Sequence, residues 1–279
     1  MWDDRRSILW WTDIYGGCVM GLEPSSGQQH NHLLGGDHRL AAALALCADG
    51  CLLVGSEHGL HLLDPDSGRL DRAVKDPRDG RDWLAFNDAR TDAHGALWIG
   101  TYDERPGQAG AVLFRIAPDG VVSEPWAGVA VVNGPAFSPD GGTLYVADTM
   151  AGRLLAAPLG QRGLAGSLQT FAELDGEGGP DGLTTDSEGG LWVAHWQRGR
   201  VVRYLPSGRC HRTISLPVPM PLSCAFGGPE LLTLYVTTGD DGMNAAALAA
   251  APLSGRLFAV DPGVTGLAER RFQPALLSG

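Results

Sequence analysis

The sequence predicts an all-β protein with the fold of a six-bladed β-propeller, and two observations support this. Glycine and proline are abundant, at 40 and 18 of 279 residues, while the hydrophobic fraction is 44%, a composition typical of many short strands joined by many turns. A short apolar run also recurs along the chain. Its six copies are Leu9-Trp10-Trp11, Leu52-Leu53-Val54, Leu97-Trp98-Ile99, Leu144-Tyr145-Val146, Leu191-Trp192-Val193 and Leu234-Tyr235-Val236.

The spacing of these runs indicates the number of blades. Their middle residues stand at positions 10, 53, 98, 145, 192 and 235, which gives steps of 43, 45, 47, 47 and 43 residues. A propeller blade is a sheet of four strands built from about 40–50 residues. The six repeats therefore predict one propeller domain over residues 1–279, with the first blade lacking its N-terminal part. A pair of packed sheets is the alternative, but it would not require a constant step.

Turn signals divide each repeat into strands. Most of the apolar runs follow a charged or Gly-rich turn, such as DAHG before Leu97 or DSEGG before Leu191. Such turns join hairpin strands because glycine adopts a positive φ without steric cost. A further turn and strand follow the runs, as in residues 152–155 and 199–204. The Ala-rich segment 243–251 is different, and it predicts a short helix or a loop insertion in the last blade.

Charge and cysteine content exclude several classes of function. The chain has 21 basic and 32 acidic residues and a net charge of -11, which argues against binding to nucleic acid or to anionic membranes. Five scattered cysteines do not suit a disulfide framework, and no leader of signal-peptide form or apolar run of membrane-spanning length is seen. We therefore expect a cytoplasmic monomer or weak dimer that acts on a small molecule.

Polar residues recur at one place in successive repeats. Counting eleven or twelve residues back from the middle of an apolar run leads to Asn87, Asn133, Asp181 and Ser223. The innermost strands of a propeller converge on a central axis, so these side chains are expected to converge as well. Two Asn carbonyls and one carboxylate make an oxygen-rich site suited to Ca²⁺, Mg²⁺ or Mn²⁺. The alternative is that the Asn-Gly and Asp-Gly pairs are ordinary turns.

Four segments carry a family resemblance. They are FNDARTDAHGALWIGT, NGPAFSPDGGTLYVADT, PDGLTTDSEGGLWVAHWQRGRVVRYLPSG and SCAFGGPELLTLYVTTGDDGM, and they resemble the regucalcin/gluconolactonase family, also called the senescence marker protein family. The resemblance implies a six-bladed propeller with one divalent cation (Ca, Zn, Mn, Mg or Fe) and sugar lactones as substrates. It also implies that Asn133 and Asp181 are metal ligands, that Asp181 is the catalytic base for water, and that Asn87 contacts the substrate.

Two departures from the family pattern accompany this resemblance. The place of the family's substrate-binding Arg, two residues before Asn87, is held by Ala85. The family's third metal ligand is a Glu in a Glu-Gly-Pro-x-Trp block whose Trp corresponds to Trp2. This Glu is therefore expected four residues upstream of Trp2, outside the sequence, and counting eleven residues back from Trp10 leads to the same region.

Further polar residues near the ends of the apolar strands are candidate substrate contacts. His195 follows the fifth run and either contacts the substrate or fills a strand end. Tyr102 and Glu104 lie at the start of a Gly/Pro-rich stretch, ERPGQAG, which either covers the site or is a plain surface loop. The pair Asp240-Asp241 either contributes to the site or forms a turn.

Other reactive residue types carry weaker signals. Ser223 and Cys224 have no His at a matching offset to activate them, which disfavours a nucleophilic mechanism. The histidines of the first two repeats match no metal-binding spacing, so we expect them to be mostly solvated. They are His30, His32, His38, His58 and His61.

Together these residues favour a metal-dependent hydrolase of sugar lactones. In this interpretation the cation polarises the lactone carbonyl and activates water, while Asp181 accepts the proton. The alternative is a non-catalytic propeller that binds a cation or a small molecule, as Ala85 and the absent Glu suggest. Hydrolysis of an organophosphate or aryl ester is a more distant third interpretation.

Overall fold

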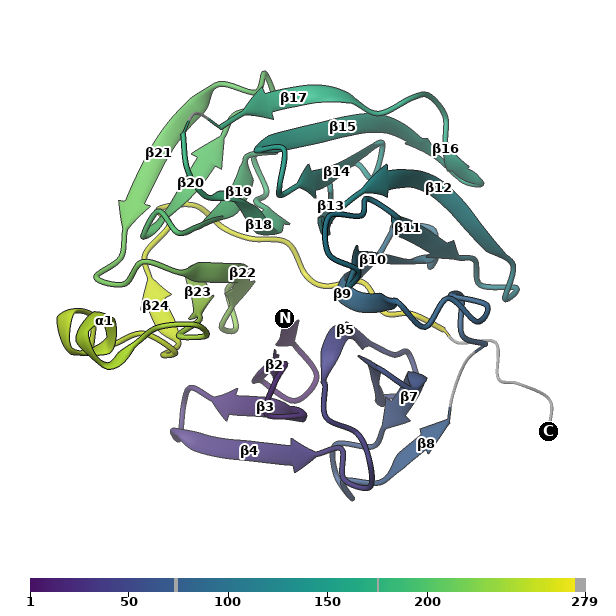
Figure 1. Ribbon diagram of the computed structural model, residues 1–279, viewed down its shortest axis with the longest axis horizontal. Coiled ribbons are helices and arrows are strands. Elements are labelled where there is room, and N and C mark those ends of the chain that lie inside the picture. The colour runs from purple at the N-terminus through teal and green to yellow at the C-terminus, as the bar shows by residue number, and fades with distance from the viewer. Residues whose placement is uncertain (73–74, 175, 274–279) are drawn as a thin grey trace. The chain divides into compact units, whose positions relative to one another are not determined.

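The chain folds into two compact units built almost entirely of antiparallel sheets (Figure 1). The structure is a computed structural model that describes residues 1–72, 75–174 and 176–273. Unit 1 comprises Met1–Val132 and the segment from Glu269 onward, and unit 2 comprises Asn133–Ala268. Each unit holds three sheets formed by consecutive strands, as expected for the blades of the predicted propeller. The prediction of one domain over the whole chain stays a prediction.

The described residues of unit 1 form three sheets of four strands each. The first sheet consists of β1 (Trp2–Asp3), β2 (Ile8–Asp13), β3 (Cys18–Glu23) and β4 (Gln28–Leu33). The second consists of β5 (Ala42–Leu46), β6 (Leu52–Ser56), β7 (Gly59–Leu63) and β8 (Leu70–Arg72). The third consists of β9 (Leu84–Thr91), β10 (Leu97–Asp103), β11 (Ala111–Ile116) and β12 (Val122–Val129).

In the part of unit 2 that the structure describes, the sheets have five, four and three strands. The five-stranded sheet consists of β13 (Val132–Phe137), β14 (Thr143–Asp148), β15 (Arg153–Gly160), β16 (Gly163–Leu164) and β17 (Gln169–Glu173). The four-stranded sheet consists of β18 (Gly179–Thr185), β19 (Leu191–Trp196), β20 (Arg200–Tyr204) and β21 (Cys210–Ser215). The three-stranded sheet consists of β22 (Pro221–Gly227), β23 (Thr233–Thr238) and β24 (Phe258–Val260).

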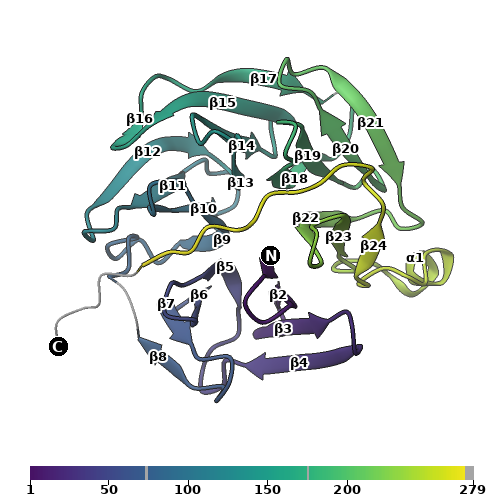
Figure 2. The same cartoon turned by 180° about the vertical axis from the view of Figure 1, so that it is seen from behind.

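The Ala-rich segment forms the predicted short helix. Helix α1 spans Ala245–Ala250 and begins at Asn244, whose side chain accepts a hydrogen bond from the Ala247 N–H group at 3.0 Å. Figure 2 shows α1 beyond β24, at the end of the three-stranded sheet. Within the described residues, no helix has the length and apolar character needed to cross a membrane.

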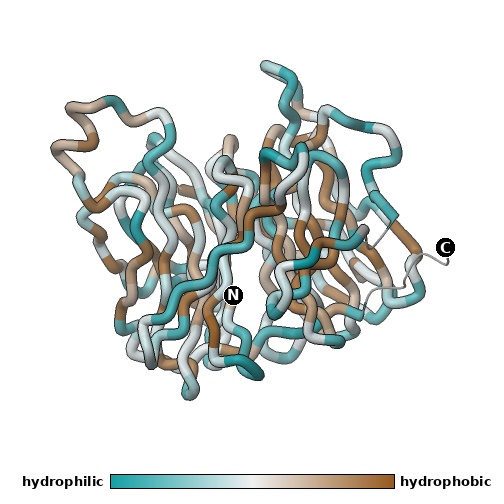
Figure 3. Tube along the Cα trace, turned by 90° about the horizontal axis from the view of Figure 1, so that it is seen from below, coloured by the Kyte–Doolittle hydropathy of each residue, from teal (hydrophilic) through white to brown (hydrophobic). Residues whose placement is uncertain are grey.

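The six apolar runs occupy the second strand of each sheet, as the repeat predicts. These strands are β2, β6, β10, β14, β19 and β23. Trp98 and Trp192, the middle residues of two runs, are fully buried. In Figure 3 brown stretches are frequent where the tube is most densely packed, and several of the projecting loops are teal. The second strand of each sheet therefore contributes apolar side chains to the core. Burial of such side chains is the main favourable term in folding.

A buried aspartate organises the turn that precedes two of these runs. Asp186 accepts hydrogen bonds from the Gly190 N–H group (2.8 Å) and the Trp192 indole N–H group (2.8 Å). Arg203, on the next strand, donates from its Nε atom to the same carboxylate at 2.7 Å. Gly189 has a φ of 84° in this turn, a conformation that glycine adopts without strain. The carboxylate thus joins the turn, the core and the third strand.

The equivalent turn of unit 1 is built in the same way. Asp92 accepts hydrogen bonds from the backbone N–H groups of His94 (2.8 Å) and Ala96 (3.0 Å). Its other oxygen accepts the Trp98 indole N–H group at 2.8 Å. Arg115, which pairs with Trp98 across β10 and β11, lies 5.9 Å from the centre of the indole ring. The Asp, Trp and Arg positions therefore recur in both units.

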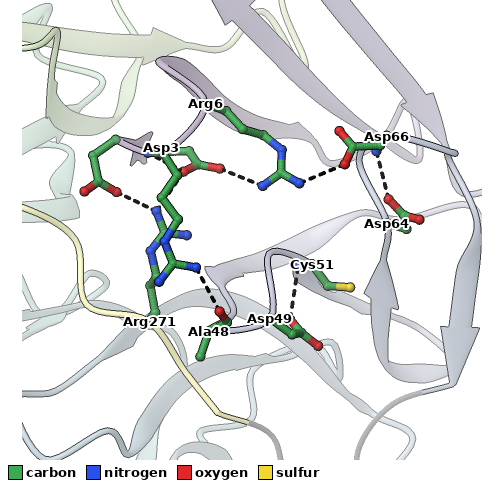
Figure 4. A network of polar contacts seen from close by, with 10 residues as sticks. Asp3, Arg6, Ala48, Asp49, Cys51, Asp64, Asp66 and Arg271 are labelled. Carbon is green, nitrogen blue, oxygen red and sulfur yellow. Dashed lines mark hydrogen bonds and ion pairs between the residues drawn. The ribbon is translucent and has the colours of Figure 1, made fainter.

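The first sheet departs from this arrangement. Asp3 stands seven residues before Trp10 instead of six, and its buried carboxylate accepts a hydrogen bond from Arg271 at 2.7 Å and lies 3.4 Å from the Arg6 guanidinium (Figure 4). These charges hold the pKa of Asp3 below its usual value against the opposing effect of burial. Within the described residues the buried Trp10 indole N–H group has no hydrogen-bond partner. Phe272, next to Arg271, bridges to Cys47 of the second sheet.

Asp186→Asn is expected to destabilise the protein strongly. Among the described residues, the substitution leaves the buried Arg203 guanidinium with only the exposed Glu188 carboxylate as an ion-pair partner, and breaking a buried pair in this way typically costs about 3–5 kcal/mol. Asp140→Asn is the matched control, because Asp140 occupies an exposed turn of the same unit and accepts the Gly142 N–H group at 3.0 Å. We expect it to cost no more than about 1 kcal/mol. Urea unfolding of both variants measures this, and equal losses would contradict the assigned role.

Candidate functional site

The four polar residues found by counting back from the apolar runs all lie on the first strand of a sheet. Asn87 lies on β9, Asn133 on β13, Asp181 on β18 and Ser223 on β22. The equivalence inferred from spacing is therefore confirmed at the level of the strands. Asn133, Asp181 and Ser223 belong to unit 2, and Asn87 belongs to unit 1.

Asp181 lies in an irregularity of β18. The register between β18 and β19 shifts between Pro180 and Leu183, so Asp181 and Gly182 together face one residue of β19. A bulge of this kind bends a strand and re-aims its side chains. Asn87 lies in a similar place, because the register of β9 against β10 shifts where Asn87 and its successor face Gly100.

Two glycines allow the strand that carries Asp181 to lie unusually close to its neighbours. A Cβ atom on Gly179 would lie 2.3 Å from the Thr149 carbonyl oxygen, and one on Gly182 would lie 2.1 Å from the Ser223 Oγ atom. Both distances are far below contact distance, so each position requires glycine. This explains the Gly-Pro-Asp-Gly sequence locally: Asp181 is held between two close approaches of backbone.

One hydroxyl links Asn133 to the strand of Asp181. The Asn133 Nδ2 atom donates to the Thr149 Oγ1 atom at 2.9 Å, and this hydroxyl donates to the Pro180 carbonyl at 2.8 Å. Because the Asn133 amide nitrogen points at Thr149, the amide oxygen points to the opposite side. Asn133 is buried and Asp181 is half-buried. Thr149 thus joins Asn133 to the residue that precedes Asp181 within unit 2, and both predicted metal ligands can offer an oxygen to a hard cation.

Gly182→Ala is expected to destabilise unit 2, because the new methyl group would force β18 away from β22. Inserting a methyl group into a well-packed place typically costs about 1–3 kcal/mol. Gly160→Ala is the control, since the nearest atoms to its added Cβ lie at 3.8 Å. Thermal unfolding of the two variants measures the effect, and a Gly182→Ala variant as stable as Gly160→Ala would show that the close approach is relaxed.

Asn87 is fixed through its amide nitrogen. Its Nδ2 atom donates to the Val132 carbonyl at 3.0 Å, and its side chain is half-buried. Ala85, two residues earlier on β9, is buried and pairs with Tyr102 on β10. A methyl group therefore stands where the family resemblance implies an arginine, and no cationic contact arises from this position.

Tyr102 and Glu104 lie at the end of β10. Burial, with smaller effects of Glu104 and Tyr15, raises the pKa of Tyr102 to about 12, so its hydroxyl stays protonated at neutral pH. Glu104 is exposed, and its N–H group donates to the Trp83 carbonyl at 3.0 Å. The following loop is closed by Asp103, whose carboxylate accepts hydrogen bonds from the Arg105 side chain and from the Gly110 N–H group (2.8 Å).

His195 lies on β19, opposite Pro180 and one residue from the bulge of Asp181. The ring is 1% exposed. Burial, with the nearby Arg200 and Arg198 guanidinium groups, lowers the pKa of His195 to about 3. Arg200 donates to the Nδ1 atom at 3.4 Å, so the proton of the neutral ring is on Nε2, which lies 3.2 Å from the Tyr204 hydroxyl. Contact of His195 with substrate stays a prediction.

The buried His195 is expected to make the protein acid-sensitive. The unfolded chain takes up a proton below about pH 6.5, whereas the folded ring takes it up near pH 3. The free energy of unfolding therefore has its full value, as far as His195 is concerned, above about pH 6.5. It falls as the pH drops toward 3, and the loss at pH 5 is up to about 2 kcal/mol. His195→Gln should reduce the difference between the free energies of unfolding at pH 7 and pH 5 by this amount. His94→Gln, at an exposed position, should leave the difference unchanged, and equal slopes in all three proteins would contradict the assignment.

The remaining candidates lie in ordinary structural places, with one exception. Asp240 and Asp241 are exposed in the turn after β23. Cys224 is buried, and its Sγ atom lies 3.7 Å from the Trp192 carbonyl. The expectation that the five histidines of the first two repeats are mostly solvated is wrong, because only His58 is exposed. Three are half-buried, and His61 is buried on β7. The His61 ring packs against that of His38, a contact that the spacing of the two residues in the sequence does not predict.

Comparisons with known proteins identify relatives along nearly the whole chain. The family profile described as "SMP-30/Gluconolactonase/LRE-like region" matches residues 1–240. The 6-deoxy-6-sulfogluconolactonase of Pseudomonas putida is 35% identical over 274 residues, covering 98% of this chain and 93% of the relative. The L-arabinolactonase of Azospirillum brasilense is 31% identical over 275 residues, covering 97% and 90%.

A solved structure shares the same architecture. The crystal structure of a calcium-binding protein, regucalcin, from Agrobacterium tumefaciens matches with a TM-score of 0.87 and 30% sequence identity. The match covers 99% of this chain and 92% of that protein. The prediction of an all-β six-bladed β-propeller is therefore confirmed.

Proposed function

Because the chain belongs to the SMP-30/gluconolactonase/regucalcin family, we propose that it hydrolyses the ring ester of sugar lactones with the help of a divalent cation held by Asn133 and Asp181. Two relatives are named as sugar lactonases. The observation that carries the proposal is the placement of Asn133 and Asp181 in unit 2, where the Thr149 hydroxyl links the Asn133 amide to the carbonyl of Pro180, the residue before Asp181.

The side chains present suit a hard divalent cation. The Asn133 amide oxygen and the Asp181 carboxylate are the kinds of donor that Ca²⁺, Mg²⁺ and Mn²⁺ prefer, and zinc and iron also accept them. Asp181 supplies the negative charge, and the Thr149 hydroxyl sets the orientation of the amide. When bound, the cation supplies Lewis-acid polarisation of the ester carbonyl.

Asp181 is the group we assign to proton transfer. Its carboxylate is half-buried on a strand held by glycines on both sides, so it is accessible and firmly placed. As general base it accepts a proton from the water that attacks the carbonyl carbon. The ring C–O bond then breaks, the ring oxygen takes up a proton, and the product is a hydroxy acid.

Substrate contacts are assigned to the polar residues that the sequence singles out. Asn87, Tyr102 and Glu104 offer an amide, a protonated phenol and a carboxylate to the hydroxyl groups of a sugar lactone. His195 is neutral and buried beside the bulge of Asp181, where its two nitrogens contact Arg200 and Tyr204 and add no charge to the site.

A non-catalytic binding module is the second candidate function, and Ala85 is the observation that favours it. Its buried methyl group provides no positive charge to hold a lactone or to stabilise the developing oxyanion. A protein of this kind would bind the cation and the sugar acid without accelerating ring opening.

Asp181→Asn is expected to abolish lactone hydrolysis. Loss of a general base typically slows a reaction by about 10²–10⁴-fold, and the lost carboxylate also weakens cation binding. Acid release is followed with a pH indicator for a panel of six-carbon and five-carbon aldonolactones, with Mn²⁺, Zn²⁺ or Ca²⁺ and with chelator. Asp140→Asn, in an exposed turn of the same unit, should retain full activity.

The result separates the two candidate functions. Hydrolysis above the spontaneous rate that is lost with chelator and in Asp181→Asn supports the lactonase. Stoichiometric cation binding without such an excess, for every lactone of the panel, overturns the lactonase in favour of the binding module.

A further inference from the structure

A second group of metal-ligating side chains gathers in unit 1. His38 lies in the loop between β4 and β5, and Glu57 and His58 form the turn between β6 and β7. One donor atom from each of these three residues lies within 4.8 Å of the others. His38 and Glu57 are half-buried, and His58 is exposed. The three side chains thus surround a place that solvent can reach.

Backbone hydrogen bonds hold this cluster together. The Glu57 carboxylate accepts the N–H groups of Arg39 (2.6 Å) and Leu40 (3.2 Å), which ties the loop of His38 to the β6–β7 turn. These bonds hold the pKa of Glu57 below its usual value although burial opposes them. Glu57 is therefore ionised at neutral pH, and the loop that carries His38 cannot leave without breaking both bonds.

The His38 ring is oriented by its neighbours. Its Nδ1 atom lies 3.0 Å from the Ser56 Oγ atom, which also accepts the His58 N–H group at 3.1 Å. The Nε2 atom of His38 therefore points away from Ser56. Metal-bound histidines commonly have their second nitrogen fixed in this way by a hydroxyl, carbonyl or carboxylate group.

Further imidazole and carboxylate groups surround His38. Its ring centre lies 5.0 Å from that of His58 and 4.7 Å from that of His61. An Asp37 oxygen lies 3.4 Å from the Nε2 atom of His58. Carboxylate and imidazole groups are thus concentrated where the β4–β5 loop lies beside the β6–β7 hairpin.

We propose that His38, Glu57 and His58 form a binding site for a divalent transition-metal ion of the zinc class. Two imidazoles and one carboxylate are a donor set found around zinc, with a fourth position for water. Calcium and magnesium prefer oxygen donors alone, so this site differs in selectivity from the oxygen pair Asn133 and Asp181. The site does not depend on the lactonase proposal.

Binding requires a small movement of the side chains. Donors that share a tetrahedral zinc ion at about 2.0–2.2 Å lie about 3.4 Å apart, so the present spacing within 4.8 Å closes by about 1.4 Å at most. The bound ion then links the β4–β5 loop to the β6–β7 hairpin, and the melting temperature rises because only the folded chain offers the complete site.

The experiment measures Zn²⁺ binding by the full chain. Metal-free Asp181→Asn protein, in which the proposed lactonase site is disabled, is titrated with Zn²⁺ in competition with a chromophoric chelator. We expect one Zn²⁺ per chain, and at least tenfold weaker binding when His58→Ala is added. His94→Ala in the same background is the matched control, because His94 is another exposed histidine of unit 1 and should leave the affinity unchanged.

Melting temperatures provide the second measurement. Zn²⁺ should raise the melting temperature of the Asp181→Asn protein and of its His94→Ala derivative, but not that of the His58→Ala derivative, whose metal-free melting temperature shows that it folds. Ca²⁺ should not replace Zn²⁺ in either measurement. Failure of the parent protein to bind Zn²⁺, or equal affinity with and without His58, overturns the proposal.

Discussion

A buried aspartate between the first two strands of a sheet is the interaction on which the surrounding structure depends. Asp92 and Asp186 each bind the backbone of their own turn with one oxygen and an indole N–H group with the other. One carboxylate therefore sets the turn, the strand register and the place of a large buried ring. Because a buried charge is costly unless it is paired and hydrogen-bonded, this arrangement tolerates little change, and the strands next to it are fixed in place.

The candidate site of unit 2 uses this fixed strand. Strand β18 begins at Gly179, carries Asp181 in a bulge, and leads directly into Asp186. One end of the strand is held by close packing at Gly179 and Gly182, and the other by the buried carboxylate. A functional carboxylate on such a strand keeps its position without a supporting loop, which is what general base catalysis requires.

Much of the fold followed from the sequence, whereas the contacts of the site did not. The step between apolar runs placed β2, β6, β10, β14, β19 and β23 correctly, and the offsets placed Asn133 and Asp181 on equivalent strands. The hydroxyl of Thr149 carried no signal, since its partners lie 16 and 31 residues away. Trp10 likewise resembles Trp98 and Trp192 in sequence but lacks their aspartate contact: Asp3 stands one residue further from its tryptophan and binds Arg271, 268 residues away.

The sequence by itself determined the number of sheets, their second strands and the turns between them, because strand periodicity and turn preference act over a few residues. Only the tertiary structure decided which polar groups meet. His38 and His58 stand 20 residues apart with no recognisable spacing, yet Glu57 binds the loop of one to the turn of the other. Such contacts depend on how loops fold back over neighbouring strands, and the hydrophobic pattern does not predict the course of a loop.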